Sequence, residues 1–236
     1  MRAGTDREGL ALLAGEVSTC RACPRLVAWR EKTAREKRLS FQGDEYWGRP
    51  ISGYGDPDAR ILVLGLAPAA HGGNRTGRIF TGDRSGDWLF ASMYRQGLTN
   101  QPHSVSADDG LELYGAYVTA AVRCAPPDNK PAVDERDRCL VYLVREAKLL
   151  REVRVVVALG GFAWDAWLRT VRTLGHSLPR PKPRFGHLAE TPAGPFTLVG
   201  SYHPSQQNTF TGRLTEEMLD AVFARARQLA GWGRAS

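Results

Sequence analysis

The sequence lacks long hydrophobic runs. Its longest apolar stretches, residues 61–64 and, interrupted by Arg154, residues 153–159, fall far short of the roughly 18 residues that a membrane-spanning helix needs. Residues 1–20 mix charged with apolar side chains and contain no uninterrupted hydrophobic segment, so we expect no secretory signal. We therefore expect a soluble cytoplasmic protein without a membrane partner, whose thiols stay reduced.

Cysteine and acidic residues are also scarce. The 236 residues include four cysteines, and 32 lysines and arginines exceed 25 aspartates and glutamates, which gives a formal charge of +7. Such a basic excess often faces a polyanion, although charge scattered for solubility explains the total equally well. With 42% hydrophobic and 24% charged residues, a disordered or fibrous chain is excluded and one domain over residues 1–236 is expected.

Two common nucleotide-binding motifs are missing from the glycine-dense segment 65–83. It has no Lys-Ser/Thr pair of a phosphate-binding loop and no G-x-G-x-x-G, which disfavours nucleoside triphosphates and NAD. Its first carboxylate is Asp83. A metal-dependent phosphoester hydrolase is therefore disfavoured as well, because magnesium sites normally need several carboxylate ligands.

What is present is an alternation of short apolar runs with helical patterns. The predicted buried strands are residues 60–65, 116–122, 153–159 and 196–200. The predicted helices are residues 6–19, 83–97, 133–150, 162–174 and 214–229. This alternation predicts a parallel sheet with helices on both faces, a three-layer α/β/α fold. Residues 30–50 and the proline-rich, basic residues 179–184 are interpreted as surface loops.

The four cysteines form one close pair and two distant single positions. Cys20 and Cys23 lie in a C-x2-C motif at the end of the first predicted helix, whereas Cys124 and Cys139 lie far along the chain. Unpaired core thiols, a structural zinc and an iron–sulfur cluster are all possible interpretations. The wide second spacing favours a [4Fe–4S] cluster, because zinc sites prefer two close pairs. Nearby arginines would offset the thiolate charge; they are Arg21, Arg25, Arg123, Arg136 and Arg138.

In sheets of this kind, binding sites form where loops leave the carboxyl ends of the strands. The first such loop has small residues that would let a planar group approach the backbone: Gly65, Ala67, Pro68 and Ala69. Phe80, at its far end, would supply a stacking face. In the second loop, Pro126 and Pro127 would hold Asn129 in one orientation, although a simple turn residue is the competing interpretation. The third loop places His203 at the mouth of the site.

Together these residues resemble the family 5 (type B) uracil-DNA glycosylases. The resemblance rests on Gly-Leu-Ala-Pro-Ala at 65–69, Arg-Thr-Gly-Arg-x-Phe-Thr-Gly-Asp at 75–83, His-Pro-Ser at 203–205 and the cysteine arrangement. It implies an α/β/α fold with a central four-stranded parallel sheet, and removal of deaminated bases from DNA in base excision repair without lyase activity. It also implies a structural [4Fe–4S] cluster whose ligands are Cys20, Cys23, Cys124 and Cys139.

Two positions depart from related families. Leu66 stands where sister families carry a polar, water-activating residue, and Ala120 stands where a related family has an asparagine that recognises uracil. The resemblance therefore implies a broader specificity that includes hypoxanthine and xanthine, with Asn129 holding the catalytic water. The loss of the polar residue at Leu66 also invites the alternative of an iron–sulfur DNA-binding module without catalysis.

We expect DNA containing uracil or another deaminated base as the partner of a monomeric protein. Phe80 would stack on the flipped base, backbone groups of residues 65–70 would bind its edge, and His203 would stabilise charge on its O2. The phosphate-contact candidates are Arg75, Arg78, Arg84 and Lys130, with the basic loop 179–184. Further DNA contacts are expected from Ser205, Gln207 and Asn208, and a residue of segment 207–210 would enter the duplex.

Overall fold

The computed structural model describes residues 3–232, and a six-stranded sheet in the order β1-β3-β2-β4-β6-β5 forms its centre. Four neighbouring strands are parallel: β3 (Ala116–Ala120), β2 (Ile61–Gly65), β4 (Val155–Leu159) and β6 (Phe196–Ser201). Every residue of β2, β3 and β4 is buried, which explains their continuous apolar sequences. The predicted α/β/α class and its four parallel strands are confirmed.

Two edge strands were not predicted. β1 (Tyr54–Gly55) pairs antiparallel with β3, and β5 (Glu190–Ala193) pairs antiparallel with β6. β1 is too short to leave a pattern in the sequence. β5 alternates exposed with buried residues and contains Pro192, which an edge strand tolerates and a central strand does not. The sheet is therefore mixed, with a parallel centre.

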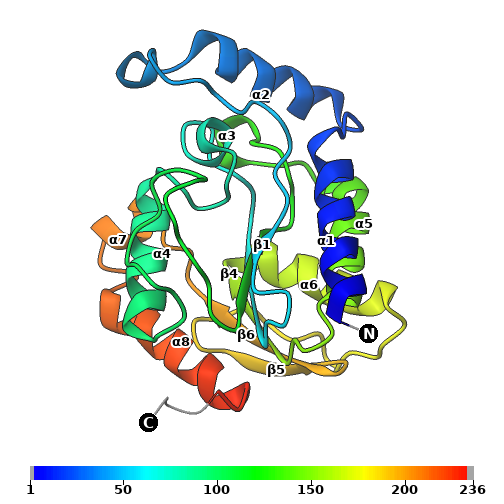
Figure 1. Cartoon of the computed structure of the whole chain (residues 1–236). Helices are drawn as coiled ribbons and strands as arrows, with labels where there is room; N and C mark the ends of the chain where they lie inside the picture. Colours follow the sequence, from blue (N-terminus) through cyan, green and yellow to red (C-terminus); the bar gives the residue numbers. More distant parts are fainter. Residues whose placement is uncertain (1–2, 233–236) are drawn as a thin grey trace.

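Long helices cover both faces of the sheet (Figure 1). On one face lie α4 (Arg84–Arg95) and α8 (Glu216–Leu229), and one apolar core is closed beneath them. On the other face lie α1 (Ala3–Ser18), α5 (Val133–Leu149) and α6 (Gly161–Thr173), over a second core. All five helices overlap the predicted ones. Among residues 3–232, no helix is long and apolar enough to cross a membrane.

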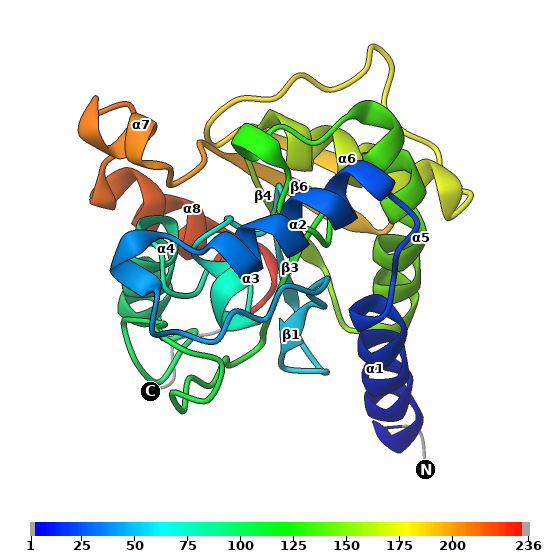
Figure 2. The same ribbon diagram turned by 90° about the horizontal axis from the view of Figure 1, so that it is seen from above.

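A further helix, α2 (Pro24–Glu36), corrects the prediction that residues 30–50 form a surface loop from their start. Its buried side chains are Leu26, Val27, Arg30 and Thr33, so a charged residue occupies one of the core-facing positions. The apolar periodicity is broken there, which hid the helix in the sequence. Figure 1 shows α2 at the top of the molecule, and Figure 2, seen from above, shows it crossing over the sheet.

Short helical turns mark the loops that leave the carboxyl ends of the parallel strands. They are α3 (Gly73–Thr76) after β2, the 3₁₀ turn η2 (Pro127–Asn129) after β3, and α7 (Gln206–Phe210) after β6. A second 3₁₀ turn, η1 (Leu39–Phe41), follows α2 within the irregular part of segment 30–50. Segment 179–184 is non-helical, as predicted.

Candidate active site

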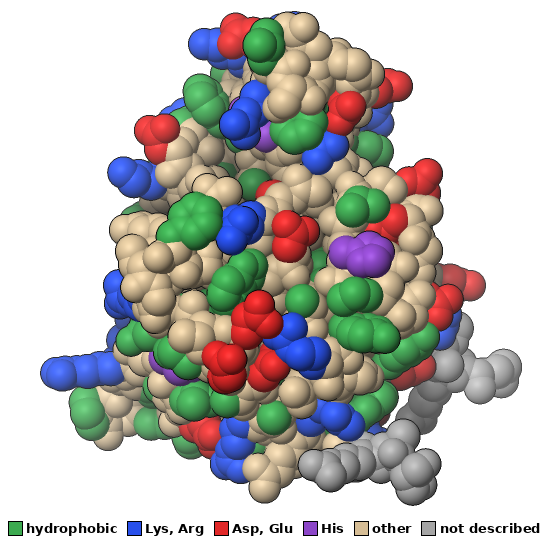
Figure 3. Space-filling model, turned by 90° about the vertical axis from the view of Figure 1, so that its left-hand side faces the viewer, with side chains coloured by type: hydrophobic (Ala, Val, Ile, Leu, Met, Phe, Trp, Pro, Cys, Tyr) green, Lys and Arg blue, Asp and Glu red, His purple; other side chains and the backbone are tan. Residues whose placement is uncertain are grey.

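A cavity of about 570 Å³ opens where the loops after β2, β3 and β6 meet. It is lined by Leu66, Ala67, Ala69 and Phe80, by Asp83, Arg84 and Ser85, by Asp128 and Asn129, and by His203, Ser205, Gln206 and Gln207. The loops that the sequence singled out therefore contribute to one site. Figure 3 shows the side of the molecule that carries α4, where basic and acidic side chains are interspersed and no single basic stripe forms.

One wall of the cavity consists of two rings from different loops. The centroids of Phe80 and His203 lie 5.9 Å apart, with 32° between the ring planes. Gly65, at the end of β2, makes room for this wall, because a Cβ atom there would lie 2.7 Å from the Phe80 ring. Gly65 and the buried Pro68 thus support the site without lining it, and Ala120 is fully buried at the end of β3, outside the cavity.

His203 is electrically neutral at physiological pH. Loss of hydration lowers the pKa of its imidazole to about 4. Its backbone is held by Asn208, whose Nδ2 donates a hydrogen bond of 2.9 Å to the His203 carbonyl oxygen. Ser205 caps α7 by accepting a hydrogen bond from the Asn208 amide. Ser205 lines the cavity, whereas Asn208 lies outside the lining and holds the histidine loop, and its contact with DNA stays a prediction.

Asn129 reaches the cavity from a backbone of unusual conformation. Asp128 and Asn129 have φ angles of 52° and 56°, in the left-handed region that aspartate and asparagine tolerate better than most residues. Arg25 holds this loop from α2, because its Nη2 donates to the Lys130 carbonyl oxygen at 3.1 Å. The same guanidinium pairs with the Glu135 carboxylate at 2.8 and 2.6 Å. Lys130 is exposed beside the cavity.

Asp83 is a site residue that the sequence analysis did not assign. It lines the cavity, and its carboxylate caps α4 by accepting a hydrogen bond of 3.1 Å from the Gly86 amide. Burial raises the pKa of this carboxyl group above its ordinary value. Its position at the start of a predicted helix was a recognisable capping signal, but capping alone does not indicate that the same carboxylate also faces a cavity.

The structure separates the candidate phosphate-binding arginines into two groups. Arg84 lines the cavity, and its guanidinium lies 4.5 Å from the centroid of the exposed Phe210 ring. Arg78 is only 7% exposed and pairs with both Asp109 oxygens at 2.7 Å. Arg75 pairs with Asp44 at 2.7 Å and lies over the Phe41 ring at 4.1 Å.

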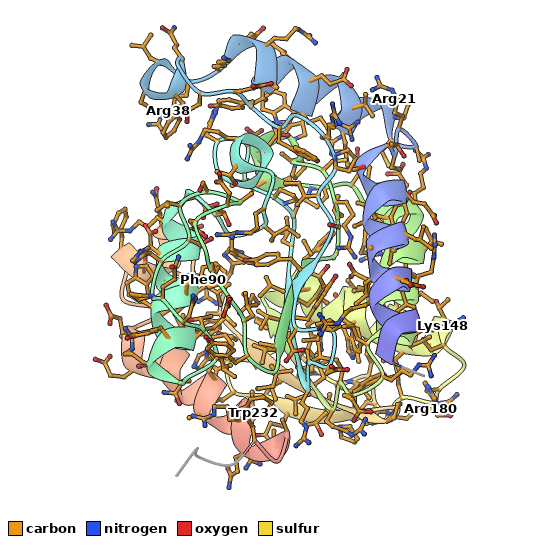
Figure 4. All side chains as sticks on the ribbon, in the orientation of Figure 1. Arg21, Arg38, Phe90, Lys148, Arg180 and Trp232 are labelled. Atoms are coloured by element: carbon orange, nitrogen blue, oxygen red, sulfur yellow. The ribbon has the colours of Figure 1, made fainter. Side chains whose placement is uncertain are left out.

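Phosphate contacts from Arg75 and Arg78 stay a prediction that these pairings disfavour. Their guanidinium groups already bind protein groups that hold the first loop in place, and neither residue lines the cavity. The basic loop 179–184 does not line it either. Figure 4 shows Arg180 on the side of the molecule opposite α4 and α7.

All four cysteines line a second cavity, of about 120 Å³, together with Arg30, Arg123 and Arg138. None forms a disulfide. Arg30 Nη1 donates to Cys124 Sγ at 2.9 Å, and the Arg123 amide donates to Cys139 Sγ at 3.3 Å. Of the predicted compensating arginines, Arg21 pairs instead with Glu31 and Arg25 with Glu135.

The character of this second cavity fits a multi-atom group of positively charged metal ions. Burial raises the pKa of Cys124 to about 11 and that of Cys139 to about 12, so forming the thiolates there requires nearby positive charge. Within residues 3–232, no three histidine, cysteine, aspartate or glutamate side chains come together as ligands of a single ion. The four thiols line one shared space, and thiolates are ligands of both zinc and iron–sulfur clusters.

Comparison with known proteins gives consistent matches. The model of a family described as the uracil DNA glycosylase superfamily matches residues 52–227. The chain is 55% identical over 217 residues to a type-5 uracil-DNA glycosylase of Mycobacterium tuberculosis, covering 91% of this chain and 80% of that protein. It is 51% identical over 216 residues to the type-5 enzyme of Thermus thermophilus, covering 91% and 95%. A type-4 uracil-DNA glycosylase of Archaeoglobus fulgidus is 31% identical over 114 residues, covering 48% and 49%.

Proposed function

The chain belongs to the uracil DNA glycosylase superfamily and, within it, to the type-5 uracil-DNA glycosylases, and from this membership we propose that it hydrolyses the N-glycosidic bond of uracil in DNA. The observation that carries the proposal is the convergence of Phe80, Asn129 and His203 on one cavity from three separate loops. The product is an abasic site, and the protein acts in base excision repair.

The first step is entry of the target base into the cavity. A base inside a duplex is out of reach, so the nucleotide must leave the stack at a cost of a few kcal/mol. The volume of about 570 Å³ is ample for one base with part of its sugar. Phe80 offers its ring face to the flipped base, and backbone groups near Ala67 and Ala69 bind its edge.

Cleavage then leaves negative charge on the departing base, while the sugar becomes oxocarbenium-like. His203 stabilises this charge by donating a hydrogen bond to the base O2. Its lowered pKa means that the donor is a neutral imidazole, so it stabilises charge without giving up a proton. The contribution of one such preorganised donor is on the order of 10²–10³ in rate.

Water attacks the sugar from the side that Asn129 faces. Its amide holds the water, and Asp83, in the same cavity lining, is the carboxylate that accepts the proton. The raised pKa of Asp83 makes its carboxylate a stronger proton acceptor than an exposed one. This pair takes the place of the polar residue that is missing at Leu66.

We extend the substrate range to hypoxanthine and xanthine. Leu66 contributes an apolar side chain to the lining, and Ala120, buried outside the cavity, contributes no polar group to it. Base recognition therefore depends on the backbone, the Phe80 ring and His203. These groups accept any base that presents an oxygen toward the histidine.

The rim of the cavity is suited to hold the duplex. Arg84 and Lys130 are exposed to solvent where phosphates can approach, and Gln207 also lines the cavity. Phe210 is 67% exposed at the end of α7, where the Arg84 guanidinium covers one face of its ring. We assign Phe210 as the side chain that fills the space left by the flipped base.

The four cysteines, Cys20, Cys23, Cys124 and Cys139, hold a [4Fe–4S] cluster in this proposal. The support is the shared lining of one cavity, the buried thiols that need positive charge, and the arginine donors at their edge. Bound to these residues, a cluster would join the α1–α2 junction to the loop after β3 and to α5. It would supply stability, and bond cleavage would depend on the protein's own side chains.

The test is base release from a defined substrate. The purified protein is incubated with duplexes containing one uracil, hypoxanthine or xanthine, and alkali-labile sites are measured against undamaged DNA. Strand cleavage after alkali treatment, without cleavage before it, is the expected result. Binding to the same duplexes without any alkali-labile product would establish the competing function, a DNA-binding module without catalysis.

A further inference from the structure

Arg30 is a buried charge that contacts two different parts of the molecule. It lies in α2 and is 2% exposed. Its guanidinium donates to Cys124 Sγ at 2.9 Å and to the Cys20 carbonyl oxygen at 3.1 Å. Its own backbone carbonyl accepts a hydrogen bond of 3.2 Å from Asn74 Nδ2. One residue therefore joins the four-cysteine cavity to α3.

Asn74 continues this connection to the substrate cavity. It is fully buried, and its backbone amide donates to the Ala69 carbonyl oxygen at 3.0 Å. Ala69 lines the cavity in which we place the base. The Asn74 carbonyl oxygen also accepts from the Gly48 amide at 3.1 Å, which ties the chain after α2 to the same point. Three consecutive hydrogen bonds thus lead from a cysteine sulfur to the substrate loop.

At the sulfur end of this connection, the buried guanidinium of Arg30 needs a hydrogen-bond acceptor. A buried guanidinium must be paired with an acceptor, and leaving one unpaired costs several kcal/mol. The Glu31 carboxylate lies 4.0 Å away and is 33% exposed, so the closer Cys124 sulfur is the principal acceptor of this guanidinium. The position of Arg30, and with it that of its backbone carbonyl, therefore depends on the state of the cysteine cavity.

We infer that Arg30 is a positioning residue that couples occupancy of the four-cysteine cavity to the order of the substrate loop, residues 66–74, through Asn74. The consequence for catalysis rests on the proposed function, whereas the coupling itself does not. Because coupling between two sites is reciprocal, a change at the loop end must also alter how firmly the cysteines hold their cluster.

The first arm of the test changes the sulfur end. Arg30→Met keeps a long side chain and removes the donors, Arg30→Lys keeps the charge, and Arg35→Met makes the same change at an exposed position of the same helix. Hydrogen exchange is measured at the amides of residues 72–77. We expect exchange about tenfold faster in Arg30→Met, an intermediate rate in Arg30→Lys, and the wild-type rate in Arg35→Met.

The second arm changes the loop end and leaves every cysteine and Arg30 in place. In Asn74→Ala, the visible absorbance of the cluster is followed after adding an iron chelator, with Asn208→Ala as a control that disturbs the substrate site through a different loop. We expect absorbance loss several-fold faster than wild type in Asn74→Ala only. Iron content before chelation is expected to equal that of the wild type.

Exchange within twofold of wild type in Arg30→Met overturns the inference, and so does an unchanged bleaching rate in Asn74→Ala. If Arg30→Met does not fold, Arg30→Lys decides the first arm. Neither readout depends on base release. A wild-type protein that releases no uracil would therefore refute the proposed function, and hydrogen exchange and bleaching would still test the coupling. If the coupling and the proposed function both hold, uracil release by iron-loaded Arg30→Met is about tenfold slower than by the wild type.

Discussion

The rings of Phe80 and His203 lie with centroids 5.9 Å apart, although the two residues come from loops that follow different strands. Those strands, β2 and β6, are separated in the sheet by β4. The absence of a side chain at Gly65 leaves the space into which Phe80 packs. A base bound beside this wall would meet an apolar face and a hydrogen-bond donor at once.

His203→Ala should reduce single-turnover release of uracil by about 10²–10³-fold, because the donor to the departing base is lost. Duplex affinity should change little. The measurement is a rate under excess enzyme, with Thr211→Ala as a control from the same loop, because Thr211 is exposed and does not line the cavity. A rate within threefold of wild type would remove His203 from the chemical step.

The low pKa of His203 also predicts how stability responds to acid. Burial lowers this pKa from 6.5 to about 4, so the unfolded chain takes up a proton in a range where the native protein does not. The contribution of neutral His203 is complete above pH 6.5 and declines as the pH falls toward 4. The urea midpoint of wild type should therefore fall more steeply across this window than that of His203→Gln. Parallel curves would contradict the assignment.

Asn129 allows side-chain and backbone effects to be separated. Asn129→Gly and Asn129→Ala both remove the amide and should abolish most of the base release. Only alanine is strained at the φ of 56°, at a cost of about 1–2 kcal/mol. The Tm measured by thermal unfolding should therefore be lower for Asn129→Ala and unchanged for Asn129→Gly. Base excision should be equally slow in both variants. Normal excision by the glycine variant would exclude Asn129 as the residue that holds the water.

The parallel sheet was predictable because β2, β3 and β4 are buried on both faces, and continuous apolar runs are their direct consequence. Helix α2 was not, because Arg30 occupies a core-facing position whose partners, Cys124 and Asn74, are distant in the chain. A sequence pattern records the polarity of a side chain and not the acceptor that makes its burial tolerable.

The same limit applies to the site. The loops with Phe80, Asn129 and His203 were predictable, since carboxyl ends of parallel strands meet at one edge. The roles of Arg75 and Arg78 could not be predicted from the sequence. Their residue type in a glycine-rich loop is the same whether they face solvent or, as here, pair with Asp44 and Asp109. Only the three-dimensional structure distinguishes a free guanidinium from one that is already bound.

The two arginine groups differ in their predicted response to salt. Arg84→Ala should reduce the slope of log affinity against log salt by about 1, because one phosphate contact is lost. Arg75→Ala should leave the slope unchanged and lower the Tm, since it loses its contacts to Asp44 and Phe41. Binding of an uncleaved duplex at several salt concentrations distinguishes them. A reduced slope in Arg75→Ala would restore it as a phosphate contact.

Phe210→Ala should affect base release according to how firmly the base is paired. A side chain that replaces the flipped base matters most when unpairing and unstacking that base cost the most free energy. Uracil release from a duplex in which uracil is paired with adenine should therefore fall by about tenfold or more. Release from single-stranded DNA should change little. Leu39→Ala is the matched control, because Leu39 is 83% exposed but lies in η1 and not in α7. Equal losses on both substrates would point to a role other than filling the duplex.

The placement of the cysteines also has a consequence for biosynthesis. Cys20 and Cys23 leave the ribosome early, whereas their partners lie beyond β3 and within α5. Helix α1 packs against α5 and cannot dock before that helix has emerged. The amino-terminal segment must therefore wait, undocked and with its thiols exposed, until the chain has been translated past Cys139. During this interval the thiols of Cys20 and Cys23 are open to oxidation, before the protein has acquired any activity.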